Sequence, residues 1–426
     1  MLVQTNRAGD TDAAARLDEF AELAASAGAT VVARVFARVD APNARFLLGT
    51  GKVEELREIK LANEADLILV NDTLSPVQER NLEKFCECRV VGRTGLILDI
   101  FALRARSHEG KLQVELAQLK HMATRLVRGW SGLDSQRGGA IGLRGPGETK
   151  LELDRRYLRG RIQQLQERLD KVALQREQTR RSRQRNAIPT VSLVGYTNAG
   201  KSTLFNRITG AGVLAEDMLF ATLDPTLRRM KLPHGRTVIL SDTVGFISDL
   251  PTHLVAAFRA TLEEVLEADL ILHVRDLSDD DNQVQSADVM RILGDLGIGE
   301  AEGADRILEV WNKIDRLEPE AHDAIVQKAS TAENVIAVSA KSGEGVDRLM
   351  DEISRRLSGV LTETAITLPV EKLALLPWLY NHAIVDNRED NEDGTVTLEV
   401  RLTETEAAEL ERRMGNGPKP QREDWE

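Results

Sequence analysis

The sequence has no apolar run long enough to cross a membrane and very little cysteine. No eighteen consecutive apolar residues occur, so no transmembrane helix is expected. The opening residues, MLVQTNR, lack the basic and apolar regions of a secretion signal. Cys86 and Cys88 are the two cysteines, and their spacing suits neither a structural disulfide nor a lone zinc site. We therefore expect two buried thiols in a reducing cytoplasm, and no stable membrane association.

The composition indicates a multidomain globular protein with an uneven charge. At 426 residues, 42% apolar and 29% charged, the chain is too long for one core, and two to four domains are expected. Residues 104–185 hold 20 Lys and Arg against 9 Asp and Glu, a local charge of +11. Since the whole chain has a net charge of −12, the other residues together carry −23. A solvated helix face is the simplest explanation of a charge run. A basic segment within an acidic chain favours contact with nucleic acid.

One segment fits the phosphate-binding pattern G-x-x-x-x-G-K-[ST] without substitution, Gly195-Tyr-Thr-Asn-Ala-Gly-Lys-Ser202. It follows the apolar run 189–194 and precedes 203–208, which can open a helix, so it has the strand-loop-helix context that the motif needs. Its glycines let backbone N–H groups and the helix N-terminus point at phosphates. We predict that Lys201 contacts the β- and γ-phosphates and that the Ser202 hydroxyl is a ligand of Mg²⁺.

Three more motifs follow in the order of a Ras-like GTPase, each at the end of an apolar strand. In Asp242-Thr-Val-Gly245, the carboxylate is expected to reach Mg²⁺ through water and the glycine N–H to sense the γ-phosphate. In Asn312-Lys-Ile-Asp315, the final carboxylate accepts two N–H groups of guanine that adenine lacks, which selects GTP over ATP. In Ser339-Ala-Lys341, the central N–H can meet guanine O6. Each motif alone could be an ordinary turn, but four in register predict a GTPase domain.

The segment Phe220-Ala-Thr-Leu-Asp224 is the predicted switch I. Thr222 is expected to ligate Mg²⁺ only when the γ-phosphate is present, with Thr226 as the alternative and a solvent-exposed hydroxyl as the simplest explanation. Phe246 stands after D-x-x-G, where Ras-like enzymes often carry a glutamine that orients water. Because phenylalanine cannot orient water, we expect slow intrinsic hydrolysis and a partner that completes the site.

Asn198 carries a further hypothesis, a K⁺ ion beside the nucleotide phosphates. Some GTPases similar in the pattern G-x-x-N-x-G-K-S use K⁺ there in place of an arginine finger, and the added positive charge would stabilise the transition state. The equal alternative is that the Asn198 side chain hydrogen-bonds its own loop, a common role of asparagine in turns.

Four regions are predicted along the chain. Residues 1–103 form an N-terminal α/β subdomain, 104–187 a helical hairpin with a Gly-rich loop, 188–360 the GTPase domain, and 361–426 a C-terminal α+β domain whose tail is disordered. The fold class is therefore multidomain α/β, built around a Ras-like P-loop GTPase domain. In the last region, residues 372–382 are predicted helical, and strands within 383–385 and 395–402 are predicted to pair.

The hairpin is predicted from apolar residues that recur every three or four positions within 107–128 and 148–186. The first of these stripes consists of Leu112, Leu116, Leu119, Met122 and Leu126. Between the helices, residues 129–147 contain seven glycines, too many for a helix and over too long a span for a tight turn. Trp130, Arg137 and Arg144 in this loop suit insertion into a folded RNA.

Beyond the nucleotide motifs, the chain resembles the HflX family of translational GTPases over about residues 15–360. The segments that carry the resemblance are Gly195–Ser202, Phe220–Thr226, Asp242–Phe246, Asn312–Asp315, Ser75–Leu82, Asp99–Ala102, His108–Leu119 and Gly142–Thr149. The resemblance implies a cytoplasmic, monomeric GTPase that binds the 50S ribosomal subunit through 23S ribosomal RNA and does not bind DNA. It also implies that stalled or idle 70S ribosomes are dissociated under stress such as heat, with the hairpin reaching toward the peptidyl-transferase region.

Two other functions remain open. The chain could be an RNA chaperone or large-subunit assembly factor in which GTP only regulates docking. A membrane-recruited GTPase is disfavoured, because no lipidation motif or amphipathic anchor is present.

The expected cofactors are Mg²⁺ and, through Asn198, K⁺. The predicted catalytic residues are Lys201, Thr222, Asp242 and Gly245, and the predicted metal ligands are Ser202 and Thr222. The predicted nucleotide-binding residues are Gly195, Tyr196, Thr197, Asn198, Ala199, Gly200, Lys201, Ser202, Phe220, Ala221, Thr222, Leu223, Asp224, Asp242, Thr243, Val244, Gly245, Asn312, Lys313, Ile314, Asp315, Ser339, Ala340 and Lys341.

Overall fold

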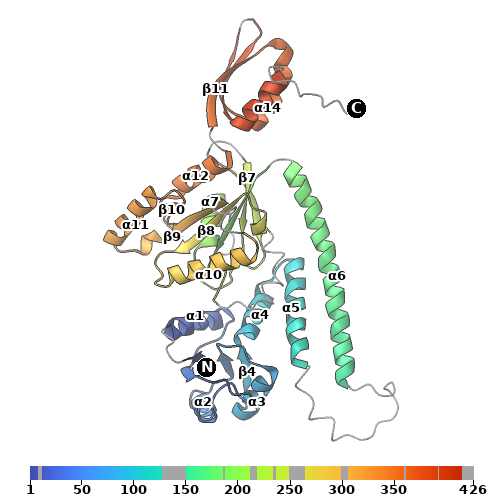
Figure 1. Ribbon diagram of the computed structural model, residues 1–426, viewed down its shortest axis with the longest axis vertical. Coiled ribbons are helices and arrows are strands. Elements are labelled where there is room, and N and C mark those ends of the chain that lie inside the picture. Colours follow the sequence, from blue (N-terminus) through green and yellow to red (C-terminus); the bar gives the residue numbers. More distant parts are fainter. Residues whose placement is uncertain are drawn as a thin grey trace, which may run out of the picture.

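The computed structural model describes residues 1–7, 12–126, 150–185, 188–211, 218–233, 237–248, 264–298, 306–358, 361–391 and 393–414. The predicted Gly-rich loop with Trp130, Arg137 and Arg144, and the predicted disordered tail, lie outside these residues. The N-terminal, GTPase and C-terminal domains follow one another along the longest axis, and two long helices run beside the first two domains (Figure 1). No helix among the described residues is long and apolar enough to cross a membrane. The predicted fold class is confirmed.

The N-terminal domain is a parallel four-stranded sheet in the order β2-β1-β3-β4, with helices between the strands. Its elements are β1 (Leu2–Asn6), α1 (Ala13–Ser26), β2 (Arg34–Arg38), α2 (Thr50–Ala62), β3 (Leu67–Val70), α3 (Pro76–Cys86), β4 (Arg89–Gly92) and α4 (Arg93–Arg104). The interior strand β1 was not predicted, because it is short and half polar. The start of α3 follows its sequence signal: Ser75 accepts from the Gln78 backbone N–H (3.3 Å), and the Gln78 side chain accepts in return (2.9 Å).

The hairpin consists of α5 (His108–Leu126) and α6 (Lys150–Arg185). Two ion pairs cross it, Arg161–Glu115 at 2.6 Å and Arg176–Glu109 at 2.8 Å, and their order in the chain shows that the helices are antiparallel. The apolar contact is made by Leu112, Leu116 and Leu165, flanked by Leu119, Ile162 and Leu169. Met122 departs from the expected stripe, because it is 46% exposed and takes no part in this apolar contact.

The described residues of the GTPase domain form a six-stranded sheet in the order β10-β9-β8-β5-β7-β6, and among these strands β6 alone is antiparallel to its neighbour. Its elements are β5 (Thr190–Gly195), α7 (Lys201–Thr209), β6 (Thr226–Lys231), β7 (Thr237–Asp242), β8 (Leu270–Asp276), α10 (Asn282–Asp295), β9 (Ile307–Asn312), η2 (Ile314–Arg316), α11 (Pro319–Thr331), β10 (Val335–Ala337) and α12 (Val346–Ser358). Strands β5, β7, β9 and β10 end at or just before the predicted motifs, so parallel pairing brings all four motifs to one edge of the sheet.

One apolar core joins the N-terminal and GTPase domains. It includes Phe20 of α1, Phe101 of α4, Val194 of β5 and Phe246 after β7, each at most 1% exposed. The two domains therefore share buried surface and are expected to unfold together.

The C-terminal domain is an antiparallel sheet in the order β11-β13-β12 with helices on one side. Its elements are β11 (Leu361–Leu368), η3 (Val370–Leu375), α13 (Leu376–His382), β12 (Ile384–Asp390), β13 (Val396–Thr403) and α14 (Glu404–Met414). Its core is separate and is centred on Leu368, Leu379 and Leu398. Strands β12 and β13 pair as predicted, whereas β11 and α14 were not predicted.

Candidate nucleotide site

The phosphate-binding loop connects buried β5 to α7 and requires both of its glycines. Gly195 has φ +152°, and a Cβ there would lie 2.2 Å from the Val274 carbonyl oxygen. Gly200 has φ +92°, and a Cβ there would lie 2.2 Å from Nδ2 of Asn312. Any larger residue would push the loop away from β8 and β9. The close approach leaves the N-terminus of α7 open to the cavity, where helix amides bind anions.

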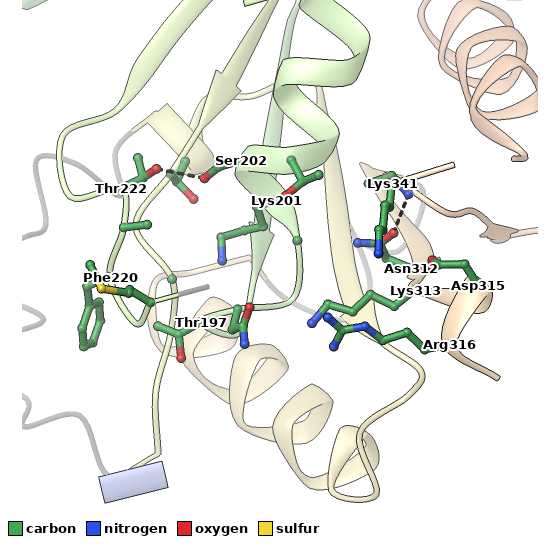
Figure 2. A pocket seen from close by; sticks show the side chains of 18 residues that line it. Thr197, Lys201, Ser202, Phe220, Thr222, Asn312, Lys313, Asp315, Arg316 and Lys341 are labelled. Atoms are coloured by element: carbon green, nitrogen blue, oxygen red, sulfur yellow. Dashed lines mark hydrogen bonds between the residues drawn. The ribbon is translucent and has the colours of Figure 1, made fainter. Parts of the chain in front are cut away.

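Lys201 lies across this loop with its amine buried. Its Nζ donates to the main-chain oxygens of Gly195 (3.1 Å) and Tyr196 (2.7 Å). Burial lowers the pKa of Lys201 to about 8, although the nearby Asp242 carboxylate opposes the shift. The amine lines the cavity. Figure 2 shows it directed into the space between Thr222 of switch I and Asn312. A phosphate in this cavity would meet a cation already held in place.

The side chains of Ser202, Thr222 and Asp242 converge on the other side of the loop. Both hydroxyls donate to Oδ2 of Asp242, Ser202 at 2.7 Å and Thr222 at 2.9 Å, and the two hydroxyl oxygens are 2.9 Å apart (Figure 2). Burial raises the pKa of Asp242, while the hydrogen bond from Ser202 opposes the shift. Oδ1 of Asp242 is buried and has no hydrogen-bond partner among the described residues. The alternative residue, Thr226, lies on β6 opposite Asp242 and does not line the cavity.

The far end of the cavity is built by the residues that follow β9 and β10. The Asn312 side chain donates to the Ala199 carbonyl (2.8 Å) and accepts from the Ala340 N–H (3.0 Å), so it ties two loops together. Ser339 Oγ donates to Oδ1 of Asp315 at 2.6 Å, which fixes that carboxylate. Lys313 has φ +64°, and its amine pairs with Asp276 at 2.6 Å. The Asp315 carboxylate lines the cavity and can face a base, whereas the Ala340 N–H that was predicted to meet guanine O6 donates to Asn312 in this structure.

A buried polar network connects the phosphate-binding loop to the N-terminal domain. The Tyr196 hydroxyl donates to Glu19 of α1 and accepts from the Ser248 N–H at 2.5 Å. Arg93 Nη2 donates to Glu19 (2.6 Å) and to the Ser248 carbonyl (2.8 Å), and Nη1 donates to Asn71 after β3 (2.8 Å). The network lies at the carboxyl ends of β3 and β4, where open α/β sheets usually bind ligands.

Two comparisons with known proteins decide the family. Residues 190–313 match the family described as 50S ribosome-binding GTPase, and residues 324–425 match the HflX C-terminal domain. GTPase HflX of Escherichia coli K12 is 50% identical, over 91% of this chain and 89% of its own length. The chain belongs to the HflX family of GTPases. It is therefore a GTP-hydrolysing enzyme whose central domain is of the ribosome-binding class.

Other relatives agree over most of this HflX-family chain. GTPase HflX of Magnetococcus marinus is 47% identical, over 91% of this chain and 88% of its own. Residues 14–102 and 104–183 match the N-terminal and middle regions of GTP-binding GTPases. A crystal structure of a GTP-binding protein from the archaeon Sulfolobus solfataricus in complex with GDP is 24% identical, with a TM-score of 0.44, over 84% of this chain and 98% of that one.

The cavity of this HflX-family enzyme gathers most of the residues predicted to bind nucleotide. Those lining it are Thr197, Asn198, Gly200, Lys201, Ser202, Phe220, Ala221, Thr222, Thr243, Gly245, Asn312, Lys313, Asp315, Ala340 and Lys341. Met218, Arg316 and Thr203 also line it and were not predicted. Arg316 directly follows the N-K-x-D motif, and this position in the sequence could have predicted that it lines the cavity. Met218 lies outside every motif, so no sequence signal indicated it.

The remaining predicted residues frame the cavity or lie elsewhere. Gly195, Tyr196, Ala199, Asp242 and Ser339 hold lining residues through the hydrogen bonds described above. Leu223 and Val244 are buried in the core shared with the N-terminal domain, and Ile314 is buried in η2. Asp224 lies outside the cavity and binds the start of α5. Phe246 is 1% exposed, so its side chain faces the shared core and not the nucleotide.

Proposed function

We propose that this enzyme is a ribosome-activated GTPase that binds the 50S subunit through 23S ribosomal RNA and dissociates stalled or idle 70S ribosomes under stress. The observation that carries the proposal is a basic, solvent-facing hairpin in the same chain as the candidate GTP site. Exposed basic side chains lie along both helices, namely Lys111 and Lys120 on α5 and Arg156, Arg159, Arg168 and Lys171 on α6. Such a surface suits the phosphate backbone of RNA. A ribosomal partner also implies action in the cytoplasm.

The buried position of Phe246 supports slow intrinsic hydrolysis and a partner that completes the site. Phe246 occupies the position of the water-orienting glutamine and is buried in the shared core. A ribosomal group that orients the attacking water would raise hydrolysis only after docking. GTP would then be hydrolysed rapidly on the ribosome and only slowly by the free protein.

We also propose that Ser202 and Thr222 ligate Mg²⁺ and that Asp242 holds it through water. Two hydroxyls and a carboxylate with one unpartnered buried oxygen form the hard oxygen set that this ion prefers. When bound, Mg²⁺ would neutralise charge on the β- and γ-phosphates.

Asn198 supports the further proposal of K⁺ at the phosphates. Its side chain is exposed on the cavity wall, and among the described residues it makes no hydrogen bond to its own loop. The backbone φ of +60° at this residue is accommodated better by asparagine than by most other side chains.

Sucrose-gradient analysis of purified 70S ribosomes with GTP, GDP or a non-hydrolysable analogue tests the proposed function. We expect the wild type to release 50S subunits with GTP, and the double variant Arg159→Glu/Lys171→Glu on α6 to lose this activity while its intrinsic hydrolysis is unchanged. The matched control, Arg291→Glu/Arg348→Glu, makes the same charge change on exposed helices of the GTPase domain and should split ribosomes normally. Binding to free precursor RNA without splitting would favour the RNA chaperone or assembly factor instead.

A further inference from the structure

Switch I (Phe220–Asp224) and the preceding Leu219 make several contacts with the N-terminal half of the molecule. The Phe220 ring meets Phe101 of α4 edge to face, with centroids 4.8 Å apart. The Leu219 N–H donates to the Ser26 hydroxyl at the end of α1 (3.0 Å). Leu219, Phe220 and Leu223 are at most 3% exposed. A change in switch I must therefore disturb its contacts with α1, α4 or α5.

The last residue of this segment binds the beginning of the hairpin. Oδ2 of Asp224 accepts from the backbone N–H groups of Arg106 (2.8 Å) and Ser107 (2.7 Å), and Oδ1 accepts from the Ser107 hydroxyl (2.6 Å). The Ser107 hydroxyl in turn accepts from the Gly110 N–H at 2.8 Å. Asp224 thus supplies the negative charge and acceptors that a helix N-terminus needs, from a segment more than a hundred residues away along the chain.

Asp224 packs so closely against α5 that Gly110 has no room for a side chain. A Cβ at Gly110 would lie 2.0 Å from Oδ1 of Asp224. Gly110 is in a helix, where glycine costs about 1 kcal/mol relative to alanine, so close approach of the carboxylate is a physical reason for it.

Asp224 is two residues from Thr222, whose hydroxyl lies with Ser202 and Asp242 at the phosphate end of the cavity. Two residues span at most about 7 Å, and the intervening Leu223 is buried. Thr222 and Asp224 therefore cannot move far independently of each other. We propose that Asp224 is a positioning residue: it anchors switch I on the N-terminus of α5, so that Thr222 and the hairpin respond together to the nucleotide.

Reciprocity follows from linkage. If the GTP-bound state favours the Asp224 contact, a ligand or mutation that displaces the start of α5 must weaken the GTP-competent position of Thr222. This coupling requires only the GTP site and the isolated protein, so it does not rest on the proposed ribosomal partner.

Hydrogen exchange of the full-length protein, read by mass spectrometry over residues 104–112, tests the link directly. With Mg²⁺ and a non-hydrolysable GTP analogue, we expect the amides of Arg106, Ser107 and Gly110 to exchange about tenfold more slowly than with GDP. Asp224→Ala should abolish this difference and lower kcat for intrinsic hydrolysis about tenfold, with little change in KM. Asp224→Asn keeps an acceptor for both amides and should restore most of the protection and rate.

Gly110→Ala tests the same link from the hairpin side, without altering switch I. Its methyl group should open the Asp224 contact and reproduce both effects of Asp224→Ala, whereas thermal unfolding should show that the chain remains folded. Ser75→Ala is the matched control, since it removes a helix cap of α3 that has no connection to switch I; its α5 amides should keep their nucleotide dependence. Equal exchange of the α5 amides with both nucleotides in the wild type, or an unchanged kcat in Gly110→Ala, would overturn the proposal.

Discussion

Arg93→Met is expected to destabilise the N-terminal and GTPase domains together. Arg93 is 6% exposed and donates to Asn71, Glu19 and Ser248 at 2.6–3.0 Å. Methionine keeps the apolar stem and removes every one of these hydrogen bonds. Loss of one member of a buried ion pair costs about 3–5 kcal/mol. Because Glu19 retains the Tyr196 and Ser248 hydroxyls, we expect the lower end of that range, about 3 kcal/mol.

The assay is a urea titration in which hydrogen exchange reports on peptides from each domain separately, since a single transition cannot be assumed for a multidomain chain. Peptides of the N-terminal and GTPase domains should shift together because they share one core, and those of the C-terminal domain should not move. Arg57→Met is the control: its ion pair with Glu87 is 3.5 Å long and exposed, so its loss should cost well below 1 kcal/mol.

A shift below about 1 kcal/mol in Arg93→Met, or a shift confined to N-terminal peptides, would refute the view that this network holds the two domains together. The double variant with Glu19→Gln provides a second check. Because the two side chains interact directly, the combined loss should fall short of the sum of the single losses.

Four further outcomes are expected. Asp315→Asn should shift preference from GTP toward XTP, since an amide can donate where xanthine presents a carbonyl; unchanged selectivity in competitive binding would place the base elsewhere. Thr222→Ala should lower kcat for GTP at least about tenfold while GDP affinity stays within about twofold, measured by single-turnover hydrolysis and nucleotide titration. Hydrolysis should be faster in K⁺ than in Na⁺, and Asn198→Ala should remove that difference; equal rates in the two salts would eliminate the K⁺ site. Burial lowers the pKa of His273 to about 4. Below pH 6.5 the unfolded state therefore binds more protons than the folded state, and the free energy of unfolding should fall by about 3 kcal/mol as the pH drops to 4. In His273→Asn, the free energy of unfolding measured in urea should depend less on pH.

The sequence alone determined the parts of this protein whose physics is local. A strand, a glycine loop and a helix must follow one another within a few residues to hold phosphates, so Gly195–Ser202 could be identified without any tertiary contact. The periodic leucines of 107–128 and 148–186 likewise predicted an antiparallel pair of helices, which the ion pairs Arg161–Glu115 and Arg176–Glu109 confirm. Strand β1 escaped prediction because a short strand gains its stability from pairing partners more than from its own residues.

Only the tertiary structure decided where the switch residues direct their side chains. Asp224 stands within a nucleotide-motif segment and was predicted to bind nucleotide, yet it binds backbone groups of Arg106 and Ser107, far away in the chain. The Tyr196 hydroxyl, inside the phosphate-binding loop, likewise faces Glu19 and Ser248. Spacing along the chain specifies which residues share an element, whereas these contacts depend on how the N-terminal domain packs against the GTPase domain. That packing is set by a shared apolar core, which has no signature in any single segment.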